Sequence, residues 1–474
     1  MRDRPTSFYG SFPVVLNKRG LTALQHLDAA APSTNTSNTT TPTSPAAADS
    51  RTTMLEKLRY CGRIVDGIEI LSQDNVVATA DTYGICIMRD QLVGLLLEAA
   101  DAFAIPIYWQ HKLLALDLDH RSAVFTPQPF DDAETPASTV DTTNKTVTVS
   151  VTQILIGSDG NYSRVRRECE KHKRLTVQDW SWGISMRYLL APDPTTTTTT
   201  TTPTTQDSPP PPAHPIDGGI HYVLGSDAYV CQQPDGDWSM SLSLNEHSDD
   251  FLLSNDPTPD NVAKLKAFCH TVSHSFTNGL LSDTTGNTPT TTDEVYASFF
   301  RNRVFNGSII KCSTLAPTDW IALIGDAAHA VAPFTGEGVN SALESARILS
   351  TVMTEDNRQH NHSRTTTHEY DMLRRPDAHA LCAYALRNRK LVAGTPAQKC
   401  TNTFGTIVLG VLKKLGWVAA VPQDLMLGAK AQEYDQPIPY TQLMDLDHAQ
   451  RWCLDPVGTC CFYTICCTCC GRCN

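Results

Sequence analysis

Basic residues are in deficit along this chain. Its 474 residues include 38 lysines and arginines against 50 aspartates and glutamates, which gives a formal net charge of −12 and a pI near 5.6. No basic stripe offsets this acidity, which argues against a nucleic-acid-binding protein. The first ten residues, MRDRPTSFYG, also lack the apolar core of a secretory signal peptide, so none is expected.

The chain also lacks an uninterrupted apolar run of membrane-spanning length. The longest apolar-looking stretch, residues 404–422, is broken near its middle by Lys413 and Lys414. Each lysine would cost about 2.5 to 3.5 kcal/mol at the centre of a bilayer. The stretch therefore predicts a buried or interfacial helix rather than a transmembrane span.

Cysteine, by contrast, is plentiful, and its 16 residues form two groups. Eight are scattered, which is typical of reduced thiols in an intracellular protein: Cys61, Cys86, Cys169, Cys231, Cys269, Cys312, Cys382 and Cys400. The others crowd into a tail at Cys453, Cys460, Cys461, Cys466, Cys467, Cys469, Cys470 and Cys473. Lipidation, with peripheral membrane association, and soft-metal binding are both open for this tail, as is the absence of any function. No metal site is assigned.

Four segments of low complexity interrupt the chain. They are rich in threonine, serine, asparagine or proline, and one holds eight consecutive threonines. Because none can bury enough apolar surface to order itself, we expect disordered surface loops within one fold. These segments are residues 32–53, 130–145, 192–215 and 282–293.

Between these segments the hydrophobic pattern changes along the chain. Residues 89–103 predict an amphipathic helix, flanked by strands at 105–108 and 147–156. Alternation at 184–188 and 239–244 indicates a half-exposed antiparallel sheet, and the pattern from 370 to about 402 is helical again. This order predicts a cofactor domain, an inserted sheet-like substrate domain and a helical C-terminal part.

Residues 321–346, IALIGDAAHAVAPFTGEGVNSALESA, form the most informative segment. An apolar strand ends in Gly325-Asp326, which places a carboxylate at the edge of a sheet. Pro333 and the sequence Gly-Glu-Gly at 336–338 then precede a helix that begins near Asn340. Glycines beside a helix N-terminus allow a flat or anionic ligand to approach the backbone closely.

A second segment, ILIGSDG at 154–160, is again a buried strand that ends in an acid and a glycine, and NYSRVR follows at 161–166. Together the two segments resemble the paired Asp-Gly and Gly-Asp motifs of the FAD-dependent aromatic hydroxylases, the para-hydroxybenzoate hydroxylase-like monooxygenases. The resemblance implies an α/β fold with a Rossmann-like FAD/NAD(P)-binding domain, an inserted mainly antiparallel β domain for the substrate, and C-terminal helices.

The same resemblance implies FAD and NADPH as cofactors and a small aromatic substrate, with the cofactor doing the oxidative chemistry. A helix N-terminus at the flavin would stabilise the negative charge of its reduced form. No protein nucleophile or metal is required. The residues carried over as cofactor-binding are Arg89, Asp159, Gly160, Gly325, Asp326, Pro333, Gly336, Gly338, Val339 and Asn340.

Further matches resemble the kynurenine 3-monooxygenase branch of that family, including VVLNKRG at 14–20 and LRRPDAHA at 373–380. By this resemblance Arg63 binds the substrate carboxylate and Asn388 lines the pocket, and an arginine suits bidentate carboxylate recognition. Two tyrosines expected of the branch are absent, near Val77 and near Asp424. Their loss leaves an aromatic carboxylate as the expected substrate class rather than kynurenine itself. The branch also implies a cytoplasmic protein or one associated with the mitochondrial outer membrane.

The resemblance sets the expected domain limits. The first part of the FAD-binding domain is expected at 1–178, with its sheet segment 60–88 contributing to the substrate domain. The remaining limits are 179–305 for the substrate domain, 306–357 for the second part of the FAD-binding domain, 366–445 for the helical region and 446–474 for the cysteine-rich tail.

One motif of the family is missing near the start of the chain. No Gly-x-Gly-x-x-Gly turn, the usual anchor for the FAD pyrophosphate, occurs there. We therefore expect an incomplete N-terminus that binds flavin poorly as it stands. Besides the hydroxylase, two alternatives stay open: another flavin-dependent hydroxylase or epoxidase of the superfamily, and an inactive flavin-free relative that serves as a binding protein.

Overall fold

The computed structural model describes residues 12–30, 53–127, 146–191, 216–277, 292–359, 366–395 and 429–451, with short gaps inside these ranges and a few residues between 398 and 426. Most of the low-complexity segments, most of the stretch 404–422 and residues 452–474 of the cysteine-rich tail lie outside the described residues, whereas residues 446–451 of that expected tail are helical. Two of the predicted loops are wrong at their C-terminal ends. Thr53 is the N-cap of a helix and forms a capping box with Glu56, and residues 292–293 are the first residues of another helix.

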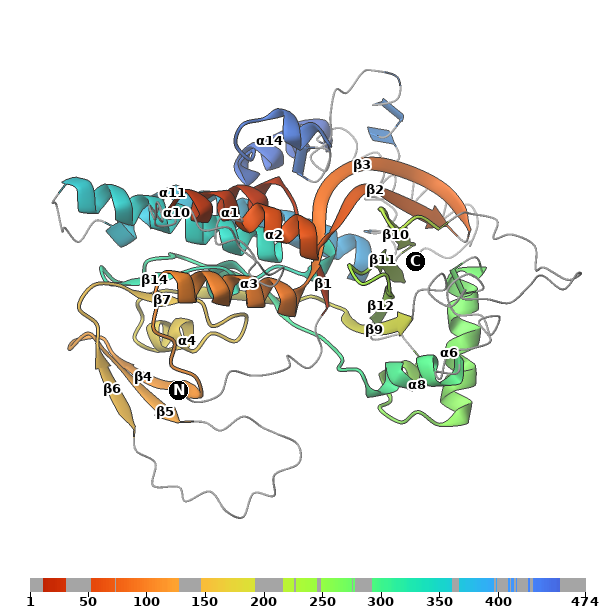
Figure 1. The fold of residues 1–474 in the computed structure, drawn as a ribbon, viewed down its shortest axis with the longest axis horizontal. Coiled ribbons are helices and arrows are strands. Elements are labelled where there is room, and N and C mark those ends of the chain that lie inside the picture. Colours follow the sequence, from red (N-terminus) through yellow and green to blue (C-terminus); the bar gives the residue numbers. More distant parts are fainter. Residues whose placement is uncertain are drawn as a thin grey trace, which may run out of the picture.

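A seven-stranded sheet forms the right half of the molecule in Figure 1. Its neighbours are antiparallel except β2 and β10, which pair in parallel although about 150 residues separate them in the chain. The long hairpin of β2 and β3 therefore carries an N-terminal segment into a sheet completed by later strands. In spatial order the strands are β1 (Pro13–Leu16), β3 (Asn75–Met88), β2 (Arg63–Ser72), β10 (Ile220–Leu224), β11 (Ala228–Gln232), β12 (Trp238–Leu244) and β9 (Ser185–Ala191).

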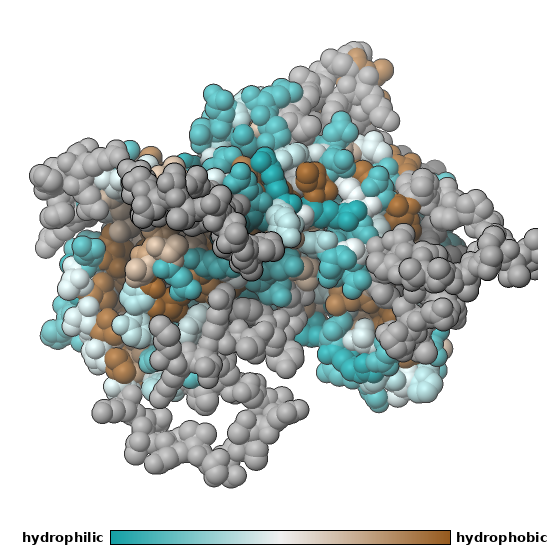
Figure 2. Space-filling view, in the orientation of Figure 1, coloured by the Kyte–Doolittle hydropathy of each residue, from teal (hydrophilic) through white to brown (hydrophobic). Residues whose placement is uncertain are grey.

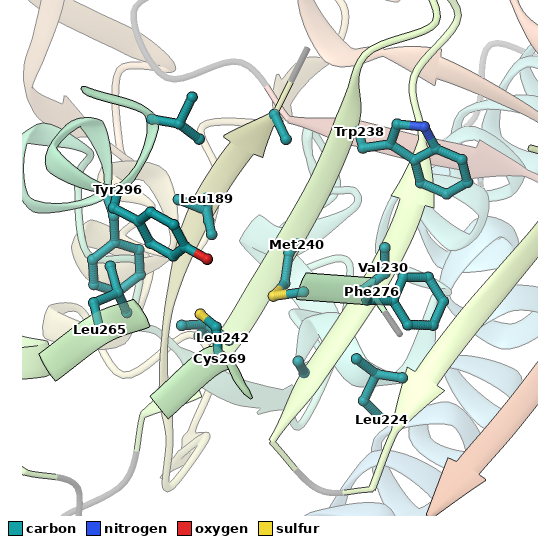
Figure 3. Packing of buried hydrophobic residues seen from close by; sticks show 14 of the residues in the cluster. Leu189, Leu224, Val230, Trp238, Met240, Leu242, Leu265, Cys269, Phe276 and Tyr296 are labelled. Carbon is teal, nitrogen blue, oxygen red and sulfur yellow. The ribbon is translucent and has the colours of Figure 1, made fainter. Parts of the chain in front are cut away.

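Helices α5 (Asp250–Leu253), α6 (Pro259–Val272) and α8 (Thr292–Arg301) accompany this sheet. Figure 3 shows Leu189, Met240 and Leu242 of the strands facing Leu265, Cys269 and Tyr296 of the helices, all in one hydrophobic core. The predicted half-exposed sheet is wrong at β12, where six of the seven residues are buried. Ser239 and Ser241, on the face opposite this core, are buried as well, and Ser243 is half-buried.

The other half of the molecule is layered around a parallel pair of strands, β7 (Leu155–Gly157) and β14 (Ile321–Leu323). Its helices are α1 (Lys18–Ala30), α2 (Met54–Cys61), α3 (Arg89–Ala102), α4 (Arg164–Lys171), α9 (Asp326–His329), α10 (Gly338–Gln359), α11 (Thr366–Ala393) and α14 (Tyr440–Arg451). The 3-10 turns are η2 (Pro333–Thr335) and η3 (Ala429–Glu433). Two smaller sheets join β8 (Val177–Ser181) to β13 (Ser308–Cys312), and β4 (His111–Asp117) to β5 (Ser122–Pro127) and β6 (Val147–Ser150).

The predicted helix at 89–103 is confirmed as α3, but the two strands predicted beside it are wrong. Residues 105–109 form no regular structure, because Ala104 adopts a left-handed conformation and Pro106 has no N–H for a partner strand. The single strand predicted at 147–156 is two strands, β6 and β7, which belong to different sheets. The helical pattern from residue 370 is confirmed as α11.

Apolar surface is visible in the left half of the space-filling view, over the part of Figure 1 that holds α3, α4, β7 and β14 (Figure 2). Ile105, Ile107 and Ile156 are each more than a third exposed. Among the helices that the structure describes, none has the length and apolar character needed to cross a bilayer.

Candidate functional site

The Gly-Asp motif forms a tight turn between β14 and α9. All three residues of β14 are fully buried, and the strand delivers the chain to Gly325, whose φ of +56° is a left-handed conformation. A side chain there would also lie 3.0 Å from the Cβ of Ala342 on α10. Only glycine fits both the angle and the packing, and this turn places Asp326 at the first position of α9.

Asp326 lies near two arginines, Arg89 and Arg166. Its side chain is exposed to solvent, yet surrounding protein raises the pKa of its carboxyl, while Arg89 and Arg166 act in the opposite direction. Arg166 is buried and donates hydrogen bonds to the carbonyl oxygens of Asp326 at 3.3 Å and Ala327 at 2.9 Å. A carboxylate in such a position can accept hydrogen bonds from the hydroxyl groups of a bound ligand.

The loop between α9 and α10 has an unfilled side. Pro333 and Gly336 are exposed, and a Cβ added at Gly336 or Gly338 would meet no atom within 4 Å. Gly336 has a φ of +69°, which closes the turn η2 before α10 begins at Gly338. We call Asp326, Pro333, Gly336 and Gly338 the open face; the first N–H groups of α10 lie beside it.

Asn340 and Val339, predicted to bind the cofactor, lie on the opposite side of the loop. Asn340 is fully buried: its amide donates to the carbonyl oxygens of Val15 at 2.9 Å and Gly336 at 3.1 Å, and accepts from the N–H of Asn17 at 3.0 Å. Val339 packs against the core between α1 and α3. The structure therefore gives Asn340 the role of fastening α1 to the loop.

Glu337, between the two glycines, is a residue that the sequence did not single out. It is fully buried and accepts hydrogen bonds from Asn17 at 2.7 Å and from the hydroxyl of Tyr440 at 2.6 Å. Burial raises the pKa of its carboxyl to about 7, against the opposing effect of Arg19. In the sequence, Glu337 is visible only as an acidic residue between two glycines. The residues that bind its carboxylate lie more than 100 positions away along the chain in either direction, so the sequence does not reveal them.

In the Asp-Gly motif the carboxylate of Asp159, unlike that of Asp326, binds the N-terminus of a helix. Asp159 caps α4, because its two oxygens accept from the Ser163 hydroxyl at 2.5 Å and from the backbone N–H groups of Arg164 and Val165. A Cβ added at the neighbouring Gly160 would meet nothing within 4 Å. Gly160 thus offers room for a ligand, whereas Asp159 is engaged by its own helix.

Arg89 connects the open face to the seven-stranded sheet. It opens α3, lies near enough to Asp326 to favour that carboxylate's charged form, and places its guanidinium 5.5 Å from the centre of the Phe12 ring. Phe12 stacks on Tyr188 of β9 at 5.8 Å, and Phe305 packs edge-on against both. Arg89 and Asp326, both predicted from the sequence to bind the cofactor, therefore lie near each other, and their cofactor role stays a prediction.

The sheet face beyond Tyr188 is polar. Tyr188, Ser241 and Tyr229 are cross-strand neighbours on β9, β12 and β11, and alternation along β11 places Cys231 on the same face. The chain of contacts continues from Cys231 to Cys86 on β3, the residue that pairs with Arg63 at the start of β2.

Arg63, predicted to bind the substrate carboxylate, is half-buried and donates from Nε to the carbonyl oxygen of Gly218 at 2.9 Å. Its guanidinium and the side chain of Gln232 both pack so closely over Gly218 that a Cβ there would overlap them. The guanidinium is therefore held in place before any ligand binds.

Asn388, the other predicted substrate residue, lies half-buried on α11, and within the described residues no hydrogen bond or ion pair joins it to Arg63. Val77, one position of a missing family tyrosine, is 59% exposed on β3, and Asp424, the other, lies outside the described residues. In the described part of the chain, no cluster of three or more His, Cys, Asp or Glu side chains could hold a metal ion.

No protein-family model matches the chain. Among curated relatives, the kynurenine 3-monooxygenase of Flavobacterium psychrophilum is 38% identical over 105 residues, 22% of this chain and 23% of the relative. That of Anopheles gambiae is 26% identical over 308 residues, which cover 63% of this chain and 52% of the relative. The matched part of the chain thus spans between about a quarter and a half of these relatives.

Solved structures give the fold. The tetrameric form of 2-methyl-3-hydroxypyridine-5-carboxylic acid oxygenase superposes with a TM-score of 0.55 at 14% identity, over 83% of this chain and 85% of that one. PqsL of Pseudomonas aeruginosa, a probable FAD-dependent monooxygenase, gives 0.51 at 15% identity, over 83% and 88%. Parts of the chain are thus similar in sequence to kynurenine 3-monooxygenases, and its fold is that of these two solved structures.

Proposed function

We propose that the chain is an FAD- and NADPH-dependent monooxygenase that hydroxylates a small aromatic substrate bearing a carboxylate, in the manner of kynurenine 3-monooxygenase. One arrangement carries the proposal: Arg89, whose charge acts on Asp326 of the open face, lies over Phe12, which stacks on Tyr188 at the polar sheet face that extends to Arg63. A flat cofactor at one end and an anionic aromatic at the other would then lie near each other.

The open face fits a flavin. Gly336 and Gly338 leave space where any side chain would intrude, Pro333 is exposed beside them, and the α10 N-terminus favours negative charge nearby. Asp326 would accept hydrogen bonds from cofactor hydroxyls, with Arg89 at its side. When bound, FAD would supply the redox chemistry with NADPH and oxygen, while the protein positions the ring and limits access of water.

Arg63 is the group proposed to recognise the carboxylate. Its Nε is engaged by Gly218, so its guanidinium is oriented before substrate arrives, which reduces the entropy lost on binding. Two neighbours in fold are consistent with this class by name: an oxygenase of a pyridine carboxylic acid, and PqsL in complex with 2-aminobenzoylacetate.

Titration of the purified protein with FAD, followed by visible absorbance, tests the cofactor assignment. Asp326→Ala should raise the dissociation constant for FAD about tenfold to a hundredfold, because cofactor hydroxyls covered in the complex would lose their hydrogen-bond acceptor, which costs about 1–3 kcal/mol. Asp101→Ala, which changes an exposed carboxylate at the end of α3, is the matched control. Equal FAD affinity in the Asp326 variant and the parent would refute the assignment.

The substrate class is tested separately, by following NADPH oxidation and hydroxylated product for a series of aromatic acids and their amides. Arg63→Ala should raise KM for the best acid about a hundredfold or more, since halving a desolvated charge pair costs about 3–5 kcal/mol, with bound FAD unchanged. The KM for the corresponding amide, which carries no charge, should change little in the same variant. An unaltered KM for the acid would remove Arg63 from the proposed carboxylate site.

A further inference from the structure

Three buried side chains of the seven-stranded sheet meet beside Arg63: Cys86 of β3, His221 of β10 and Cys231 of β11. They are 0%, 1% and 2% exposed. The sulfur of Cys86 lies 3.9 Å from the carbonyl oxygen of Gln232, the residue after Cys231, and each thiol is near enough to the other to shift its pKa. Two cysteines that are 145 positions apart in the sequence are thus neighbours in the core.

His221 lies on the same face as the two thiols. Its Nδ1 pairs with the hydroxyl of Tyr229, and the two rings pack edge-on with their centres 5.5 Å apart. Its Nε2 is buried without a nitrogen or oxygen partner in the described part of the chain and faces the Cys86 thiol instead. The imidazole is therefore placed to accept or return a proton at sulfur.

Cys86 differs from other buried thiols of this protein. The hydrogen bond from Cys231, together with His221 and Arg63, lowers the pKa of Cys86 to about 6 despite its burial. Burial alone raises the pKa of Cys269, in the core under α6, to about 12. Thiolate is the reactive form of cysteine, so the chemistry of this pair sets it apart from the structural cysteines.

We propose that Cys86 and Cys231 are a redox-active pair that closes to a reversible disulfide when the folded protein meets hydrogen peroxide. The Cys86 thiolate attacks one peroxide oxygen, the O–O bond breaks, and hydroxide leaves and takes up a proton to become water. The Cys231 sulfur then attacks the Cys86 sulfur, the S–O bond breaks, and the Cys231 proton passes, directly or through His221, to the departing oxygen, which leaves as the second water. Two thiols are oxidised, one peroxide is reduced to two waters, and a dithiol reductant reverses the step.

The pair is tested by peptide mapping of the full chain without FAD, NADPH or substrate, so the outcome does not depend on the proposed function. Folded protein is treated with dilute hydrogen peroxide, free thiols are blocked on denaturation, and the protein is digested with trypsin. Cleavage after Arg63 and Arg89 releases residues 64–89, in which Cys86 is the sole cysteine. Cleavage after Arg187 and Lys264 releases residues 188–264, in which Cys231 is the sole cysteine. We expect these two peptides joined, at about 2 Da below their summed mass, and separated again by dithiothreitol.

Variants make the mapping specific. Cys86→Ser and Cys231→Ser should each abolish the joined peptides, whereas Cys269→Ser, which removes a buried thiol outside the pair, should leave their yield unchanged. If a variant fails to fold, peptide mapping of the parent protein alone still tests the proposed disulfide. The proposal is overturned if peroxide leaves both thiols free for blocking, or if Cys86 is recovered only as sulfinic or sulfonic acid with Cys231 still reduced.

Discussion

Glu337 occupies a charge-balanced site. Around it lie two arginines, Arg19 and Arg374, and two further carboxylates, Glu344 and Asp377; Arg374 contacts both carboxylates at 2.7 and 3.0 Å. Two positive and two negative charges already cancel, so a third carboxylate gains little from ionising in this buried position. Burial is the main cause that raises the pKa of Glu337 to about 7, because Arg19 offsets it only in part and Glu344 acts in the same direction as burial.

The raised pKa of Glu337 predicts a pH dependence of stability. Between its ordinary value of 4.5 and about 7, the folded protein binds more protons at this group than the unfolded chain does, so the free energy of unfolding falls as pH rises through that window. Glu337→Gln removes this component and keeps the size of the side chain. Its melting temperature relative to the parent should therefore rise from pH 4.5 to pH 7 and then level off. Thermal melts across this range provide the measurement, with the exposed Glu98→Gln as control; a constant difference would contradict the burial of a protonated Glu337.

Sequence and structure agree on single residues where the signal is local. The Gly325-Asp326 turn depends on residues within a short segment, so the motif alone predicted the position of its carboxylate. The family resemblance implies a cofactor role for Asn340, but the partners of its side chain, Val15 and Asn17, come from the opposite end of the chain. The Cys86 and Cys231 contact leaves no trace in the sequence, since nothing in either segment predicts that the two strands converge.

At the scale of elements, α1 and α10 pack with almost no space between their backbones. A Cβ added at Gly20 of α1 would lie 2.4 Å from Oδ1 of Asn340, the atom that accepts the hydrogen bond from Asn17. The close approach lets α1 lie directly against the helix whose N-terminus borders the open face. One glycine thus controls the distance between two helices.

Gly20→Ala should destabilise the protein by about 1–3 kcal/mol, because the methyl group forces apart a packed helix pair and disturbs Asn340. Gly94→Ala in α3 is the matched control: it is also a helical glycine, but nothing lies within 4 Å of the added methyl. The control should stabilise by up to about 1 kcal/mol through helix propensity. Urea unfolding of both variants measures the difference, and equal shifts in the same direction would show that α1 and α10 are not closely packed.

Helices and strands were predicted correctly where a periodic pattern of apolar residues also had another part of the protein to pack against or pair with. Leu92 and Leu95 of α3 repeat at helical spacing and are buried as predicted. The residues at 105–108 are equally apolar, yet Ile105 is 55% and Tyr108 79% exposed, because no strand is available to pair with them. Composition indicates what a segment can form, whereas tertiary pairing decides whether it forms.

At the scale of the whole molecule, one buried ionic network joins four helices. Arg19 of α1 and Glu344 of α10 form a 2.5 Å ion pair, and Arg374 and Asp377 of α11 complete the set. Arg19 also lies 3.7 Å from the ring centre of Tyr440, where α14 begins. The network therefore holds the first and last described helices against the two that border the open face.

Arg374→Met should cost about 3–5 kcal/mol of stability, because it leaves Glu344 and Asp377 buried with Arg19 as their one remaining cation in the network. Arg301→Met breaks an ion pair with Glu294 on the surface of α8 and should change the urea midpoint little. Denaturant unfolding followed by circular dichroism compares the two. A similar small shift for both would mean that the buried network is not essential for holding the helices together.

The contact between Arg19 and Tyr440 also constrains biosynthesis. Residue 440 is made 421 positions after residue 19, so at about 5–20 residues per second the N-terminal helix waits roughly 20 to 80 s for its last partner. For most of this time Leu21 and Leu24, buried in the finished protein, also lack Val339 and Leu343 of α10, which pack against the same core. The nascent chain would thus depend on chaperones, and slower translation would lengthen its exposure to aggregation.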